Sequence, residues 1–367
     1  MVGGIAVASA AYLGEGPKRH TVLVVPDGAF LVVRGDISAL RKTAALSSLP
    51  PDKLGKWLNG DRVSRVCGFD PSARIGEFLA VVPEGGEKGE FAIVARTTVP
   101  KDDLMRCVQR LAQEGGRDLT TKTEGRDTSV TLPTQAGELV YREGGLLAIG
   151  QRPFLSVLLA TLDGKLPGAS PQSPHVRLAH ELRGATEPSA TNATIVATVV
   201  LPRSLRERLK AENVGPEGTA TMTGVLGVEA LGVSLTTGPS GGMTELSARF
   251  VCESPTACAE VDKLLQAQRL KLSQQIGLRL AGFGPLVDSF KTESTGPALT
   301  ASARTRTDDL ARGLTFAADY LGKSAPAPPP EARPDVPRIA PDEVLKPRPN
   351  ARPPATVPAP GTSTGAR

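Results

Sequence analysis

Residues 66–111 read VCGFDPSARIGEFLAVVPEGGEKGEFAIVARTTVPKDDLMRCVQRL, and this stretch contains the pattern that decides the fold. Two apolar segments, residues 78–82 and 91–94, are separated by the polar, glycine-rich segment PEGGEKGE (residues 83–90). Short apolar runs on either side of such a turn are typical of paired strands. We therefore expect an antiparallel β-hairpin, and its loop is the best exposed candidate for contacting a partner.

A helix is expected directly after this hairpin. Pro100 suits the first helical turn, where a missing N–H costs nothing. Asp102 and Asp103 lie near the positive end of the helix dipole, and Gly115 ends the helix. The expected buried stripe consists of Leu104, Cys107, Val108 and Leu111.

The same order of elements returns about 150 residues later in the chain. Residues 92–113 (AIVARTTVPKDDLMRCVQRLAQ) and 245–266 (ELSARFVCESPTACAEVDKLLQ) both contain a strand with Ala-Arg, a turn with proline and an amphipathic helix. Runs of strands punctuated by packing helices predict the α+β class. We expect two related halves, each an antiparallel meandering sheet with helices packed on one face.

Shifts in composition predict the boundaries of these parts, because proline-rich stretches without apolar periodicity are typical of linkers and tails. The expected segments are an apolar signal or anchor remnant (1–20), a first α+β half (21–163), a linker with at most one helical turn (164–190), a second α+β half (191–322) and a disordered proline-rich tail (323–367).

Three aspartates are interpreted as structural anchors. Asp36 precedes the helical pattern ISALRKTAAL and is expected to cap that helix by accepting a backbone N–H bond. Asp70 suits a turn before Pro71, and Asp102 suits a helix start. The strand at residues 29–33 is apolar on both faces, which predicts a strand buried on both sides.

The first residues contain an apolar run from Val2 to Leu13, which is shorter than the roughly 20 residues needed to cross a bilayer. Ala8-Ser9-Ala10 fits a signal-peptide cleavage pattern, although the basic segment that normally precedes the run is missing. The run is either a weak signal peptide or the tail of a membrane tether that begins upstream of Met1. A buried first strand or helix is the alternative.

Residues 323–367 are rich in proline and nearly free of large apolar residues. Such a segment cannot bury enough surface to offset its ordering entropy, which predicts disorder. An inert spacer is the favoured interpretation. The alternative is a partner for the tail that binds a PxxP segment such as Pro326–Pro329.

The segments VPDGAFLVVRGDISALRKT (residues 25–43) and CGFDP (residues 67–71), with the strand–helix–strand order, resemble uncharacterised exported proteins of myxobacterial type. Those proteins carry an N-terminal anchor and a proline-rich end, and no activity is established for them. The resemblance implies an envelope location and carries no catalytic residue over to this chain.

The chain has four cysteines, Cys67, Cys107, Cys252 and Cys258. An even number in a chain with an export-like start suggests disulfides. Three connectivities exist, and the spacing favours Cys67–Cys107 and Cys252–Cys258. The alternative is four buried free thiols in a cytosolic protein. A metal site is not expected, since the sequence has neither CxxC nor a Cys/His cluster.

The familiar catalytic motifs GxxxxGK[ST], GxSxG and HExxH do not occur, and no cofactor is expected. His175 and His180 are five residues apart, whereas helical metal ligands are usually four apart, so they are interpreted as a solvated pair. The net charge of +5 is spread thinly and aromatic residues make up only 4%, which argues against nucleic acid as a partner. The helix sides Arg203/Arg206/Lys210 and Arg269/Lys271 are interpreted as solvated.

These features favour an extracytoplasmic (periplasmic or membrane-anchored), non-enzymatic binding or scaffold protein of the cell envelope, whose partner is an unidentified protein or envelope component. Two alternatives remain open. One is a periplasmic or secreted enzyme with a cleft between its halves, and the other is a cytosolic structural protein with reduced thiols.

Overall fold

The fold is taken from a computed structural model that describes residues 24–43, 60–85, 90–131, 137–184, 193–212, 225–239 and 241–324. The expected N-terminal anchor and the tail from residue 325 onward lie outside the described residues, as do residues 86–89 of the PEGGEKGE loop.

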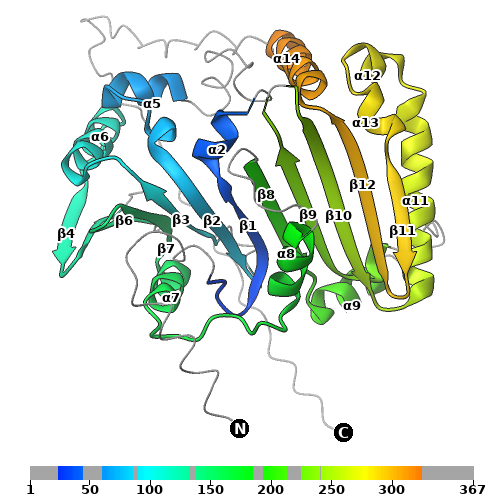
Figure 1. The fold of residues 1–367 in the computed structure, drawn as a ribbon. Helices are drawn as coiled ribbons and strands as arrows, with labels where there is room; N and C mark the ends of the chain where they lie inside the picture. The colour runs from blue at the N-terminus through cyan, green and yellow to red at the C-terminus, as the bar shows by residue number, and fades with distance from the viewer. Residues whose placement is uncertain are drawn as a thin grey trace, which may run out of the picture. The chain divides into compact units, whose positions relative to one another are not determined.

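The described strands form one antiparallel sheet of twelve strands, in the order β11-β12-β10-β9-β8-β1-β2-β3-β7-β6-β5-β4 (Figure 1). The predicted hairpin is β2–β3, in which Val81 lies opposite Ala92. With the packed helices, this sheet confirms the α+β class. The strands are β1 (Ala29–Asp36), β2 (Ile75–Pro83), β3 (Ala92–Thr97), β4 (Thr120–Glu124), β5 (Asp127–Thr131), β6 (Gly137–Arg142), β7 (Leu146–Gln151), β8 (Ala193–Val200), β9 (Val228–Thr237), β10 (Met243–Cys252), β11 (Lys291–Thr295) and β12 (Ala298–Arg306).

The two parts of the sequence share this single sheet. β1 and β8 pair antiparallel at its centre, with Val33 opposite Ala197. Outward from this joint the order is β1-β2-β3-β7-β6-β5-β4 on one side and β8-β9-β10-β12-β11 on the other. The expectation of a separate sheet in each half is therefore corrected. Each half alone would leave a strand edge unpaired at β1 or β8, and the two edges satisfy each other.

Helices lie on both faces of the sheet, which differs from the expectation of one covered face. Successive residues of a strand point to opposite faces, so one strand can support a helix on each side. In β6, Val140 packs in the core with α7 while Leu139 and Tyr141 pack in the core with α6. The helices are α2 (Ile37–Arg41), α5 (Gly60–Cys67), α6 (Lys101–Glu114), α7 (Arg152–Leu162), α8 (Pro174–Gly184), α9 (Arg203–Glu212), α11 (Pro255–Ser273), α12 (Ile276–Leu280), α13 (Gly284–Asp288) and α14 (Thr307–Ser324), with a short 3-10 helix at Pro71–Arg74.

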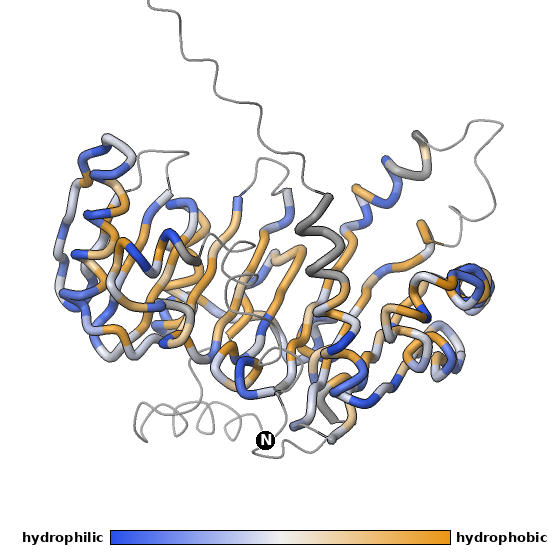
Figure 2. Tube along the Cα trace, turned by 90° about the horizontal axis from the view of Figure 1, so that it is seen from above, coloured by the Kyte–Doolittle hydropathy of each residue, from blue (hydrophilic) through white to orange (hydrophobic). Residues whose placement is uncertain are grey.

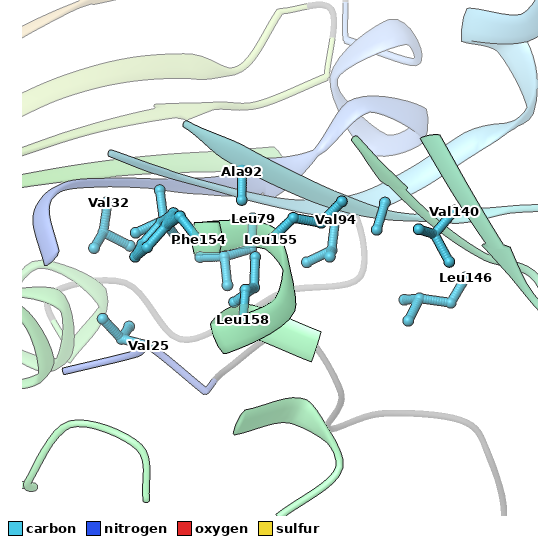
Figure 3. Packing of buried hydrophobic residues seen from close by; sticks show 12 residues of the cluster. Val25, Val32, Leu79, Ala92, Val94, Val140, Leu146, Phe154, Leu155 and Leu158 are labelled. Carbon is cyan, nitrogen blue, oxygen red and sulfur yellow. The ribbon is translucent and has the colours of Figure 1, made fainter. Parts of the chain in front are cut away.

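The largest core lies between α7 and the sheet. Figure 3 shows Phe154, Leu155 and Leu158 of α7 below the strand residues Leu79 and Val94. Leu79, Val94 and Leu158 are fully buried. The apolar segment FLSVLLATL (residues 154–162) thus forms most of α7 and buries its large side chains against the sheet.

Two smaller cores lie on the opposite face. Leu104 of α6 packs with Leu139 and Leu147. At the other end of the sheet, Val261 of α11 packs with Leu299 of β12. We call the side that carries these two helices the α6/α11 face.

The segment expected as a linker contains α8, an 11-residue helix that packs on the same face as α7. Leu178 and Leu182 of α8 lie directly over Gly232 of β9, where an added Cβ would come within 2.6 Å of the Leu182 side chain. The helix is anchored further by an ion pair between Glu181 and Arg249 of β10. The sequence of α8 has only weak apolar periodicity. The helix is held in place by its close packing on Gly232, a residue about 50 positions later in the chain.

His175 is buried, which corrects its interpretation as solvated, while His180 is exposed. The His175 ring lies between Nδ1···Thr198 Oγ1 at 2.7 Å and Nε2···Ala29 O at 2.8 Å. A carbonyl only accepts, so Nε2 carries the proton and Nδ1 accepts from the threonine hydroxyl. The neutral ring thereby connects α8 to β1 and β8.

Acidification should weaken the fold through His175. Desolvation by burial is the main influence on its pKa and lowers it from the ordinary value, while the bond to Ala29 opposes this. Because the folded pKa is depressed, stability is present above the unfolded pKa of about 6.5 and is lost as pH falls through the folded value. Urea unfolding at several pH values should show this loss in the native chain and not in His175→Gln. The exposed His180→Gln is the control and should follow the native curve.

Candidate functional site

The central strands carry an apolar surface on the α6/α11 face of the sheet. Figure 2 shows hydrophobic residues, in orange, along these strands. We call this surface the apolar face. Each side chain on it is at least partly exposed, and Leu246 reaches 37%. Its residues are Phe78, Ala80 and Val82 of β2, Leu31 and Val33 of β1, Ile195, Ala197 and Val199 of β8, Leu231, Val233 and Leu235 of β9, and Leu246, Ala248 and Phe250 of β10.

Strand register places these residues in three rows that cross the strands, because directly paired residues project to the same face. The first row is Val82, Leu31, Val199, Leu231 and Phe250. The second row is Ala80, Val33, Ala197, Val233 and Ala248. The third row is Phe78, Gly35, Ile195, Leu235 and Leu246.

The middle row consists only of alanine and valine, whereas larger side chains stand in the rows beside it. In the third row, Gly35 leaves room for its neighbours, since a Cβ there would lie 3.1 Å from both Ile195 and Phe78. Those two side chains therefore close over the glycine. The small side chains of the middle row thus form a shallow strip across five strands, with larger apolar side chains in the rows on both sides. We call the middle row the low strip.

β1 shows how this surface differs from the sequence-based expectation. Residues 29–33 were expected to be buried on both sides, but only Val32 is buried, and Leu31 and Val33 are partly exposed. The apolar residues on both faces of this strand correctly indicated that each face has an apolar surface. Its interpretation was wrong because the sequence does not say which face a helix covers.

Described helices surround the apolar face. α6 packs beside it against β6 and β7. α11 packs against β10 and β12 at its other side, where Phe250 lies partly against the α11 core. α8 covers the opposite face of β8 and β9, and α2 contacts β2 and β8 next to the end of β1. Exposed contiguous apolar surface of this kind marks interaction sites in soluble proteins.

The four cysteines form the two pairs that the spacing favoured. The Cα atoms of Cys67 and Cys107 are 4.5 Å apart, and those of Cys252 and Cys258 are 5.6 Å apart, with sulfur atoms at bonding distance in both pairs. The first pair joins α5 to α6, and the second joins β10 to the first turn of α11. Both disulfides thus fix helices of the α6/α11 face.

The buried charges form structural ion pairs. Arg142, whose side chain is 9% exposed, donates two hydrogen bonds to Asp127 at 2.7 and 2.8 Å and one to Asp163 at 2.6 Å. Arg126 and Lys165 also pair with Asp163. The hydrogen bonds from Arg142 hold the pKa of Asp127 below its ordinary value, and those to Asp127 raise the pKa of Arg142. Because these arginine, lysine and aspartate side chains pair with one another, we interpret the cluster as one that stabilises the fold.

The predicted basic helix sides have different environments. Arg206 is buried, which corrects its interpretation as solvated, and it pairs with Glu253 and with Glu229 at 3.4 Å. Arg203 is exposed and pairs with Glu207 one helical turn later. The side chain of Lys210 lies outside the described residues.

The three anchor aspartates occupy local structural positions. Asp36 accepts the Ala39 N–H at 3.0 Å and so caps α2, as predicted. Asp70 follows α5 and pairs with Arg41 at 2.9 Å. Asp102 lies in the first turn of α6.

The described residues contain neither a metal-ligating cluster nor a helix fit to cross a membrane. No group of three or more His, Cys, Asp or Glu residues among them is arranged to hold a metal ion. No helix in the same part of the chain has the length and apolarity needed to cross a membrane.

Comparison with known proteins yields little. No family model matches the chain, and no curated protein matches it significantly. Two solved chains match, among them crystal form I of TP0453, with 11% identity, a TM-score of 0.42, and coverage of 79% of this chain and 95% of that one. A likeness at this level carries no functional inference.

Proposed function

We propose that this chain is an extracytoplasmic, non-enzymatic binding protein that holds the acyl chain of a lipid against its apolar face. The observation that carries the proposal is the partial exposure of fourteen apolar side chains on five adjacent strands. Leaving such a surface open costs stability in water, and an apolar ligand would recover that free energy.

The polarity of the apolar face supports an acyl chain. Backbone N–H and C=O groups of the five strands pair with neighbouring strands, and the fourteen side chains carry no polar atom. A polar ligand would lose its hydrogen bonds to water here and find no replacement. An acyl chain has none to lose.

The dimensions of the low strip also support this ligand. Five adjacent strands at about 4.8 Å spacing give a middle row of about 19 Å. Acyl chains in one leaflet span about 15 Å, half of the hydrocarbon core of a bilayer. Neighbouring rows are about 6.7 Å apart along a strand, so the tall rows flank a strip wide enough for one chain.

The two disulfides support an oxidising compartment, because such bonds persist in secreted and periplasmic proteins and are rare in the cytosol. Lipids and lipidated molecules of the envelope are ligands of the proposed chemistry. The disulfides can be tested by the mass of the protein purified without reductant. This mass should be lower than that of the reduced chain by four hydrogens.

Ala248→Glu should weaken binding of a dansyl-labelled fatty acid. The new carboxylate would stand in the middle row, and desolvating it beside an acyl chain should weaken binding by at least about tenfold. Fluorescence titration of the full chain measures the dissociation constant.

Ser247→Glu is the matched control, because Ser247 is the neighbouring residue of β10 and projects to the opposite face. It should bind the probe like the native chain. Equal loss in both variants, or saturable binding that survives Ala248→Glu, would assign the probe to another place. Thermal unfolding of both variants separates loss of binding from loss of fold.

A further inference from the structure

The turn between α11 and α12 exposes four large aliphatic side chains. Leu270 is 61% exposed, Leu272 39%, Ile276 73% and Leu280 78%. Ile276 and Leu280 are four residues apart on α12, so they project from one side of that helix. Leu270 and Leu272 are two residues apart on α11 and project to different sides, so Ile276 and Leu280 form the centre of the exposed apolar surface.

The turn is held to the body of the protein from its inner side. Arg279 Nε donates to the carbonyl of Ser273 at 3.1 Å, which ties α12 to the end of α11. After α12, Ala281 is buried, and the Phe283 ring lies against Gly313 of α14, where a Cβ would come within 2.9 Å of it. The inner residues are thus packed, and the exposed aliphatic residues face outward.

The segment of chain from residue 263 through this turn carries a net positive charge. Residues 263–287 contain no Asp or Glu and four basic residues, Lys263, Arg269, Lys271 and Arg279. Asp288 follows and pairs with Arg279 at 2.6 Å. Four basic residues against one acid leave a net charge of +3 over residues 263–288.

We propose that the α11–α12 turn docks onto the surface of an anionic lipid bilayer. Exposed aliphatic side chains beside basic ones are the composition of segments that lie in a membrane interface, with the apolar residues about 5–10 Å into the headgroup and acyl boundary. The basic residues supply the attraction to anionic headgroups. The excess positive charge of the turn favours an anionic bilayer over a neutral protein as its partner. The proposal is independent of the acyl-chain site, whose residues lie on other elements.

The test is co-sedimentation of the full chain with phosphatidylcholine vesicles, with and without phosphatidylglycerol. Binding should be at least about tenfold tighter with the anionic lipid and should weaken as salt is raised. Ile276→Ser/Leu280→Ser should lower binding at least about tenfold, since two aliphatic side chains no longer enter the interface. Lys271→Gln should lower it by about fivefold.

Leu166→Ser is the matched control, because Leu166 is also an exposed aliphatic residue, at 41%, and lies beyond α7. It should bind vesicles like the native chain, and so should Ala248→Glu, which separates this surface from the acyl-chain site. Equal, salt-independent binding to both vesicle types overturns the proposal. An absence of vesicle binding also overturns it. So does a dimer of the native chain that dissociates in Ile276→Ser/Leu280→Ser while vesicle binding stays unchanged.

Discussion

Removing the Cys67–Cys107 disulfide should lower the free energy of unfolding by about 4 kcal/mol, since this bond closes a ring of 40 residues. In the chain-entropy model the bond restricts the unfolded chain, and the restriction grows with the length of the ring. The ring includes the β2–β3 hairpin and connects α5 to α6. The measurement is urea unfolding of Cys67→Ala/Cys107→Ala beside the native chain.

Cys252→Ala/Cys258→Ala is the matched control, because it also removes one disulfide whose two cysteines are buried. Its ring spans only six residues, which predicts a smaller loss of about 2 kcal/mol. If the short ring proved as costly as the long one, the entropic explanation would fail, and local packing of α11 against β10 would account for the stability instead.

Arg142→Met should lower the free energy of unfolding by about 3 kcal/mol at neutral pH, because it leaves partly buried carboxylates without their main partner. Asp127 loses two hydrogen bonds and Asp163 loses one. Asp163 keeps Arg126 and Lys165, which places the loss at the lower end for a broken buried pair. Chemical unfolding measures the difference.

The pH dependence of this difference provides a second readout. Arg142 holds the folded pKa of Asp127 below its ordinary value, so the resulting stability is present above the unfolded pKa of about 3.9 and is lost as pH falls through the folded value. The gap between the native chain and Arg142→Met should therefore narrow on acidification. Arg126→Met is the control: its side chain is 57% exposed, and it should cost no more than about 1 kcal/mol. A gap that stays constant down to acid pH would contradict the proposed role of Asp127.

Much of the local structure is predictable from sequence. The β2–β3 hairpin, the start of α6 directly after Pro100 and the Asp36 cap follow from turn composition, proline placement and side-chain capping, which depend on neighbouring residues. β4, with the sequence TTKTE, was not predicted. All five of its residues are exposed, and a polar strand at a sheet edge has no apolar alternation to reveal it.

The sequence shows which apolar residues make up the candidate sites, but it does not show that they are exposed. The apolar residues of β1 were visible in the sequence, but they were assigned to a strand buried on both sides. The exposed Ile276 and Leu280 belong to α12, a short helix that the sequence pattern did not predict. In both cases burial depends on what packs above the residue, and that information is non-local.

By itself, the sequence determined the α+β class, the main strands and helices, and the favoured cysteine pairs, because periodicity, turn residues and spacing act over short stretches of chain. Only the tertiary structure decided that the two halves share one sheet through β1 and β8, that α8 closes over Gly232, and that the described helices leave apolar side chains of the central strands partly exposed on one side. Strand pairing and the covering of a face join residues far apart in the chain, and a single residue of register determines which side chains they expose.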